Sequence, residues 1–214
     1  MMTPVVLLAA LIAGPADAAG SESFVIEREF EAVTCGSSVK LASKSTGFRL
    51  HSHEVNYGTG SLQQSVTGFP RGDDPNSYFV VSGGFGEGDC ARGQPVRCGQ
   101  TVRLQHLQTG KFLHSHGNIP SPLSGNQEVS AYAGPDSGDN WKVLCSASRA
   151  RYWQREQSVK LQHADTGYFL GTSKRYQYQN VITGQLEVSA RQAARGDEEQ
   201  WAVQEGIFFA STEA

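Results

Sequence analysis

One sequence motif occurs three times in this chain, and this repetition limits the folds that the chain can adopt. The central copy, residues 101–116, reads TVRLQHLQTGKFLHSH. Related copies span residues 38–53 (SVKLASKSTGFRLHSH) and residues 158–172 (SVKLQHADTGYFLGT). Each copy has a Val-x-Leu pair before a Thr-Gly turn and a second leucine after it, which is the pattern of two short strands in a hairpin. The sequence therefore predicts a fold built from repeats of one small unit.

Two further landmarks follow each copy in the same order, at a period of roughly 60 residues. The first is a valine, and the second is an aromatic residue with a valine two positions later. The landmarks are Val66, Val129 and Val188, followed by Tyr78, Trp141 and Trp201. We expect these side chains to pack in a common core, with the two tryptophans buried rather than stacked against a sugar.

Each unit contains four candidate strands, because alternating apolar residues mark one face of a strand. No stretch has the sustained spacing of an amphipathic helix. Several prolines fall between the candidate strands, among them Pro75, Pro95, Pro120, Pro122 and Pro135. Three units of four strands predict an all-β domain. We favour a β-trefoil, in which half of the strands form a barrel and half form hairpins that cap it, because closure removes exposed sheet edges.

A single unit could not bury its own apolar face, so we expect the three units to form one domain. This domain should span residues 24–210, with repeats at about 35–90, 98–145 and 155–208.

The N-terminal residues 1–18 have the features of a secretory signal peptide. The apolar run at residues 5–13 is too short to span a bilayer, and Ala16-Asp17-Ala18 forms an A-x-A cleavage pattern. We expect a mature chain that is lumenal or secreted and has no membrane insertion. The formal net charge is -3 at pH 7, so the chain lacks the basic surplus that a nucleic acid or an anionic membrane attracts.

The chain has 4 cysteines, and in an oxidising lumen these are expected to form disulfides, for which three connectivities are open. Cys35 and Cys98 precede the first and second repeats, and Cys90 and Cys145 close them. We favour the symmetric pairing, Cys35 with Cys90 and Cys98 with Cys145. The alternative contains the near-sequence pair Cys90–Cys98. No C-x-x-C spacing indicates a zinc site.

The duplicated His-Ser-His motif is the most suggestive candidate for a binding site. Residues two apart share one face of a strand, so each pair of histidines is expected to point the same way. One interpretation is a polar surface for a sugar or an extended peptide. The other is that the histidines bond to turn backbone and hold each hairpin. The candidate surface comprises Arg49, His51, His53, Tyr57, His114, His116, Asn126 and Gln127.

We expect no catalytic site, metal or cofactor. Equivalent positions of a three-fold fold lie on different lobes, so the two His-x-His pairs cannot share one ion at zinc–nitrogen bonds of roughly 2 Å. One pair alone supplies only two ligands. The sequence has no G-x-S-x-G nucleophile elbow, and Ser52 should point away from its flanking histidines. His163, alone in the third unit, is expected to be structural.

Several short segments resemble a known family. They read CGS at residues 35–37, LHSH at 50–53 and 113–116, GSLQQSVTG at 60–68, CGQ at 98–100, SPLSGNQEVS at 121–130 and EGIF at 205–208. The units resemble the MIR motif, named for protein mannosyltransferases, inositol trisphosphate receptors and ryanodine receptors. The chain as a whole resembles the stromal cell-derived factor 2 family.

This resemblance implies a non-enzymatic β-trefoil protein of the endoplasmic reticulum lumen. The implied partners are a lumenal J-domain co-chaperone and the chaperone BiP, with unfolded or glycoprotein clients. Family members often end in a retrieval signal similar to His-Asp-Glu-Leu, whereas this chain ends Ser211-Thr-Glu-Ala214. We therefore expect retention through a partner, or slow secretion, in place of direct retrieval.

The alternative function is a glycan-binding, lectin-like module. Gln200-Trp201 faintly resembles the Gln-x-Trp signature of ricin-type lectins, although the other units lack it. A mannosyltransferase activity is not expected, because those enzymes carry the motif between many membrane helices, and this chain has none after its N-terminal segment.

Overall fold

The computed structural model describes residues 25–193 and 196–213, which form strands and short 3-10 helices and contain no α-helix. The predicted signal peptide lies outside the described residues. The first unit has β1 (Ser38–Ser43), β2 (Arg49–Asn56), β3 (Gln64–Phe69) and β4 (Phe79–Gly83). The second has β5 (Thr101–His106), β6 (Phe112–Pro120), β7 (Gln127–Tyr132) and β8 (Trp141–Cys145). The third has β9 (Val159–His163), β10 (Phe169–Gln177), β11 (Leu186–Arg191) and β12 (Trp201–Ile207). The 3-10 helices are η1 (Arg28–Phe30), η2 (Pro75–Ser77) and η3 (Ser137–Asp139).

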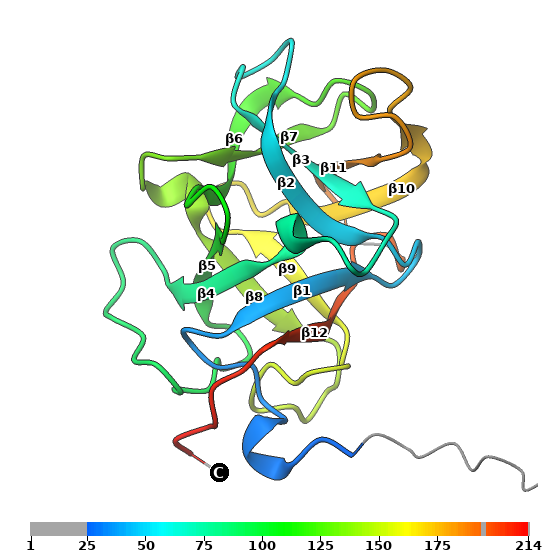
Figure 1. The fold of residues 1–214 in the computed structure, drawn as a ribbon. Helices are drawn as coiled ribbons and strands as arrows, with labels where there is room; N and C mark the ends of the chain where they lie inside the picture. The colour runs from blue at the N-terminus through cyan, green and yellow to red at the C-terminus, as the bar shows by residue number, and fades with distance from the viewer. Residues whose placement is uncertain (1–24, 194–195, 214) are drawn as a thin grey trace, which may run out of the picture.

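The first and last strands of each unit form a closed barrel. Going round it, β1 pairs with β4, β4 with β5, β5 with β8, β8 with β9, β9 with β12, and β12 with β1 again, all antiparallel. The middle strands form the hairpins β2–β3, β6–β7 and β10–β11, which lie together over one end of the barrel (Figure 1). This arrangement confirms the predicted β-trefoil.

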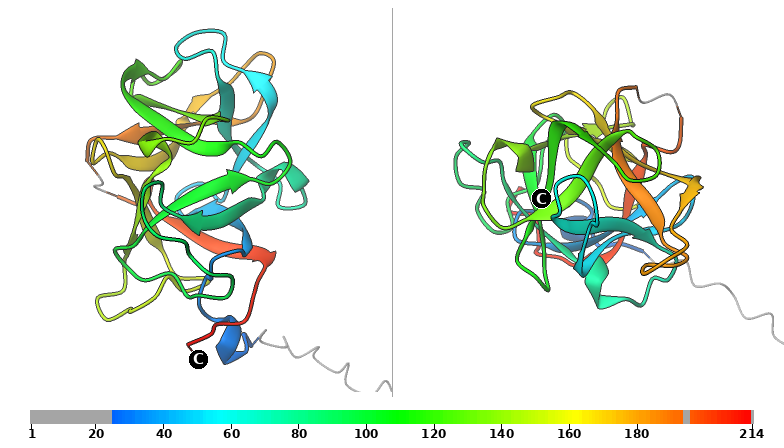
Figure 2. Two further views of the ribbon diagram at one scale, coloured as in Figure 1. Left: turned by 90° about the vertical axis from the view of Figure 1, so that its left-hand side faces the viewer. Right: turned by 90° about the horizontal axis from the view of Figure 1, so that it is seen from above.

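The three hairpins are joined to one another at the pseudo-three-fold axis of the cap. Their inner strands pair in a triangle, β3 with β7, β7 with β11 and β11 with β3, and Figure 2 shows the cap from above in its right-hand view. Side chains repeat the same cyclic order, since one amide of each unit contacts a hydroxyl of the next. These contacts join Gln63 to Ser130, Asn126 to Ser189 and Gln185 to Thr67.

Buried glutamates tie two of the hairpin loops to the neighbouring unit. Glu187 on β11 accepts hydrogen bonds from the backbone N–H groups of Leu123 and Ser124 in the loop of the second unit. Glu128 on β7 contacts the Ser61 hydroxyl in the loop of the first unit in the same way. Burial raises the pKa of Glu128. The first unit has Ser65 at the equivalent position, so the third hairpin loop lacks this contact.

Trp141 and Trp201 lie in the core, as predicted, and both are fully buried. Each indole N–H donates to the carbonyl of the leucine that centres its own unit's second strand, Leu113 and Leu170, at 2.9 Å. A buried tryptophan needs such a partner for its polar atom. Both rings are therefore structural and unavailable to a ligand.

The aromatic landmark of the first unit is Phe79, so the expected alignment of Tyr78 with the tryptophans was wrong by one residue. Phe79 is fully buried and pairs with His106, as Trp141 pairs with His163. Tyr78 lies half-buried beneath the Lys40 ammonium, 4.5 Å from the ring centre. Because Tyr78 and Phe79 are both aromatic, the sequence alone does not show which of them is equivalent to the tryptophans. The strand β4 begins at Phe79, one residue after Tyr78.

The disulfides follow the symmetric pairing, Cys35–Cys90 in the first unit and Cys98–Cys145 in the second. Each bridge starts in the segment before its unit's first strand. In the first unit it ends after β4, at Cys90, and in the second it ends on the last residue of β8, Cys145. The alternative pair Cys90–Cys98 is excluded. Each bridge therefore closes its own unit and leaves the third without one.

We predict that replacing Cys98 and Cys145 together by serine lowers the free energy of unfolding by about 2–4 kcal/mol, because the unfolded chain regains the entropy of a closed loop. Urea unfolding of the variant and the parent, both measured at neutral pH, provides the test. An unchanged midpoint would contradict the stabilising role of this bridge.

Candidate binding site

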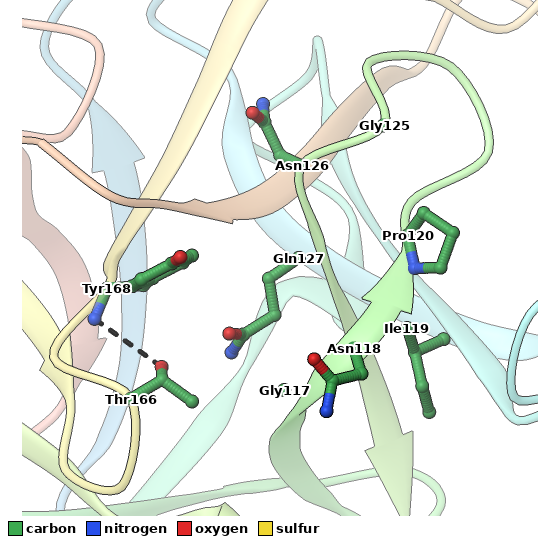
Figure 3. A pocket seen from close by; sticks show the side chains of 9 residues that line it. All are labelled: Gly117, Asn118, Ile119, Pro120, Gly125, Asn126, Gln127, Thr166 and Tyr168. Atoms are coloured by element: carbon green, nitrogen blue, oxygen red, sulfur yellow. Dashed lines mark hydrogen bonds between the residues drawn. The ribbon is translucent and has the colours of Figure 1, made fainter.

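A hollow of about 430 Å³ lies between the cap hairpin of the second unit and the β9–β10 turn of the third (Figure 3). Its walls come from the outer end of β6, the start of β7 and the turn that carries Thr166 and Tyr168. The lining residues are Gly117, Asn118, Ile119, Pro120, Gly125, Asn126, Gln127, Thr166 and Tyr168.

The hollow is formed where β6 leaves its regular pairing with β7. The register passes from Ser115 opposite Val129 directly to Pro120 opposite Gln127, so the intervening residues of β6 bulge outward. Asn118 has a φ of 70°, a left-handed conformation that asparagine tolerates better than most residues. The bulge leaves its backbone and side-chain amides facing the hollow.

The equivalent position between the first and second units is bridged. There the Gln64 amide donates to both Ser52 and Thr109, at 2.8 and 3.0 Å. Gln127, the counterpart of Gln64, donates only to Ser115, at 2.7 Å, and its amide extends toward Thr166 without a bond between them (Figure 3). The hollow lies where this bridge is missing in the second unit.

The lining groups suit hydrogen bonding and stacking. Amides come from Asn118 and Gln127, and the Tyr168 ring forms one wall (Figure 3). No carboxylate, amine, imidazole or thiol belongs to the lining residues. An amide donates and accepts at once, so this surface can bond to a peptide backbone or to sugar hydroxyls.

Two of the predicted surface residues, Asn126 and Gln127, line this hollow, although Gln127 is itself buried. The structure corrects the prediction for His51, Tyr57 and His114, which are buried. The histidines lie under η2 and η3, which pack on β2 and β6, and strand alternation alone could not show this cover. The Tyr57 hydroxyl donates to carbonyls at the cap axis.

The remaining predicted residues do not share one surface with the hollow. Arg49 forms an ion pair with Glu205 at 3.1 Å. His53 is half-buried, and its Nδ1 lies 2.9 Å from His51 Nε2. His116 is exposed beside Asp136. Within each pair the two imidazole rings lie close together, as expected for residues on one face of a strand.

Burial shifts the pKa of several histidines. Burial lowers the pKa of His51 from 6.5 to about 4, against the smaller opposing effect of the Asp74 carboxylate. Burial likewise lowers the pKa of His53, His106 and His163. These imidazoles are therefore neutral hydrogen-bonding groups at pH 7.

Comparison with known proteins shows consistent similarity. The family model of the MIR domain matches residues 46–203. Stromal cell-derived factor 2-like protein 1 of Mus musculus is 51% identical over 180 residues, 83% of this chain and 78% of the relative. Stromal cell-derived factor 2 of Homo sapiens is 46% identical over 184 residues, 85% of this chain and 84% of the relative.

The chain belongs to the stromal cell-derived factor 2 family of MIR-domain proteins.

A solved structure of the same family agrees with this fold. The crystal structure of the SDF2-like protein from Arabidopsis thaliana matches with a TM-score of 0.80 and 42% sequence identity, covering 85% of this chain and 99% of that chain.

In this MIR domain, the histidines that precede two of the Thr-Gly turns have a structural role. His163 Nδ1 lies 2.9 Å from the Thr166 hydroxyl, and its Nε2 lies 3.1 Å from the carbonyl oxygen of Gly138. His106 makes the equivalent contacts to Thr109 and Asn76. The structural role expected for His163 is confirmed, and the histidine links each turn to the 3-10 helix of the preceding unit.

Sequence reasoning missed most of the hollow of this MIR domain. Thr166 and Tyr168 belong to the repeated Thr-Gly turn, a pattern that indicates a hairpin and not a binding site. The available signal was the residue after the glycine, which is Phe48, Lys111 and Tyr168 in the three units. Gly117 and Asn118 extend the His-Ser-His motif, but their bulge depends on the pairing of β6.

In the part of the chain that the structure describes, no helix has the length and apolar character needed to cross a membrane.

The low pKa of His51 predicts a pH-dependent stability. The unfolded chain takes up a proton at this residue below about pH 6.5, whereas the folded chain does so only near 4. The contribution of His51 to the free energy of unfolding is therefore fully present above about pH 6.5 and is lost as the pH falls toward 4.

We expect His51→Gln to remove about 3 kcal/mol of this pH dependence. Urea unfolding of the parent and the variant at several pH values between 4 and 7 measures it. Parallel stability curves for the two proteins would contradict the assignment.

Proposed function

We propose that this protein is a non-enzymatic binding module of the endoplasmic reticulum lumen that acts with a J-domain co-chaperone and BiP. In this role it assists the folding and quality control of secretory proteins. The membership of the stromal cell-derived factor 2 family carries the proposal. The two disulfides support it, because such bridges persist in the oxidising secretory pathway.

The hollow between the second and third units is a suitable place for an unfolded client. Its backbone and amide groups at Asn118 and Gln127 can pair with the exposed backbone of an extended chain, independently of the client's side chains. Ile119 and Pro120 add apolar surface at one side. Such a site recognises a general feature of unfolded proteins, which a quality-control factor requires.

The test of this function is capture from lumenal extract under mild cross-linking. The folded chain is expected to recover a J-domain protein together with BiP. The matched control is the same chain after reduction and alkylation, which presents an unfolded polypeptide that BiP binds as a client. Recovery of the J-domain protein by the folded chain but not by the control supports the proposal, and recovery of neither partner by the folded chain contradicts it.

The second candidate function is glycan binding in the same hollow. The observation that favours it is the combination of amide groups with the Tyr168 ring, since sugars bind through hydroxyl hydrogen bonds and through stacking on an aromatic face. This function would let the module distinguish glycoprotein clients.

We expect mannose-type glycans, added to the labelled protein, to shift the amide NMR signals of Gly117, Asn118 and Tyr168. Asn118→Gly removes one amide while it tolerates the positive φ, so it should weaken the shifts several-fold. Lys111→Ala, at the position equivalent to Tyr168, should leave them unchanged. An absence of shifts rejects glycan binding and leaves the co-chaperone proposal standing.

A further inference from the structure

Three ionisable side chains converge in the second unit, and none of them lines the hollow. His114 and His116 lie on β6, and Asp136 is the N-cap residue of η3, which packs on β6. One ligand atom from each residue lies within 4.8 Å of the other two. Among the residues that the structure describes, this is the only such group of His, Cys, Asp and Glu.

Asp136 forms no hydrogen bond with either histidine of this group. His114 Nδ1 is 3.6 Å from Asp136 Oδ1, and His116 Nε2 is 3.7 Å from Asp136 Oδ2. Both exceed the length of a hydrogen bond. Two ligands of a tetrahedral zinc ion with bonds of about 2.0–2.1 Å lie about 3.4 Å apart. Small side-chain shifts therefore suffice for one shared ion.

The local charge also favours a cation. Asp139, fully buried, accepts a hydrogen bond from His114 Nδ1 at 2.9 Å. Within the described part of the chain, neither Asp136 nor Asp139 has an ion pair with lysine or arginine. A buried carboxylate is costly without a compensating charge. The His114 atom near Asp136 is Nδ1, so a bound ion takes the place of the proton that Nδ1 donates to Asp139. The ring proton then moves to Nε2, which is buried and has no hydrogen-bond partner.

The first unit shows what the same motif looks like when it is closed. There His51 Nε2 and His53 Nδ1 are 2.9 Å apart, close enough to hydrogen-bond to each other. Asp74 caps η2 as Asp136 caps η3, but Ser77 stands where the second unit has Asp139. The first unit therefore has one carboxylate fewer and a histidine pair that is already engaged.

We propose that His114, His116 and Asp136 bind a zinc-class divalent cation. Two imidazoles and a carboxylate favour Zn²⁺ or Co²⁺ over Mg²⁺ and Ca²⁺, which prefer an all-oxygen set. The side chains of His116 and Asp136 are 47% and 41% exposed, so the remaining coordination position is open to water or to an external ligand. The ion would join β6 to η3 on the surface of the second unit.

The experiment titrates the full-length, tag-free mature chain with Co²⁺, whose visible spectrum reports four-coordinate binding, and then displaces it with Zn²⁺. We expect one ion per chain. His116→Ala removes an exposed ligand, and Asp136→Asn keeps the N-cap acceptor of η3 while it removes the charge. Each variant should weaken binding about tenfold or more. His53→Ala, the matched change in the first unit, should bind as the parent does.

Circular dichroism of each variant checks that the fold is kept. A parent that gives no four-coordinate spectrum would overturn the proposal. Equal affinity in His116→Ala and the parent would also overturn it, as would the loss of binding in His53→Ala.

Discussion

The pairing of the three inner cap strands around one axis is the constraint on which the structure depends. Each of the strands β3, β7 and β11 pairs along one edge with the other strand of its own hairpin. The two ends of its other edge pair with the inner strands of the two neighbouring units. The barrel closes in the same cyclic order. No unit can bury its core alone, so the triplicated sequence gains its stability only when all three units assemble.

Both proposed sites lie where the three units differ. Equivalent positions have the same backbone surroundings, so a single change of side chain shows its effect directly. Gln64 bridges to the next unit, whereas Gln127, which lines the hollow, does not. The second unit has Asp139 at the position where the first unit has Ser77. Its His-x-His pair therefore lies beside two carboxylates, Asp136 and Asp139. The shared scaffold is structural, and both proposed sites depend on departures from three-fold symmetry.

The all-β trefoil, the disulfide pairing and the buried tryptophans could be predicted because they depend on alternation and on repeat spacing. The burial of His51 and His114 could not, because it depends on 3-10 helices that fold back over β2 and β6. The hollow lies at a bulge in β6 that changes the pairing register, and the alternation of apolar residues does not predict such a bulge. The one-residue shift at Phe79 arose because its neighbour is also aromatic.

Native-state hydrogen exchange of the backbone amides in β3, β7 and β11 tests this dependence on closure most directly. If the three units are stable only together, these amides exchange with one common free energy of opening, equal to that of global unfolding. The account would be contradicted if the amides of the third unit, which has no disulfide, opened in a separate step while the other two units stayed protected.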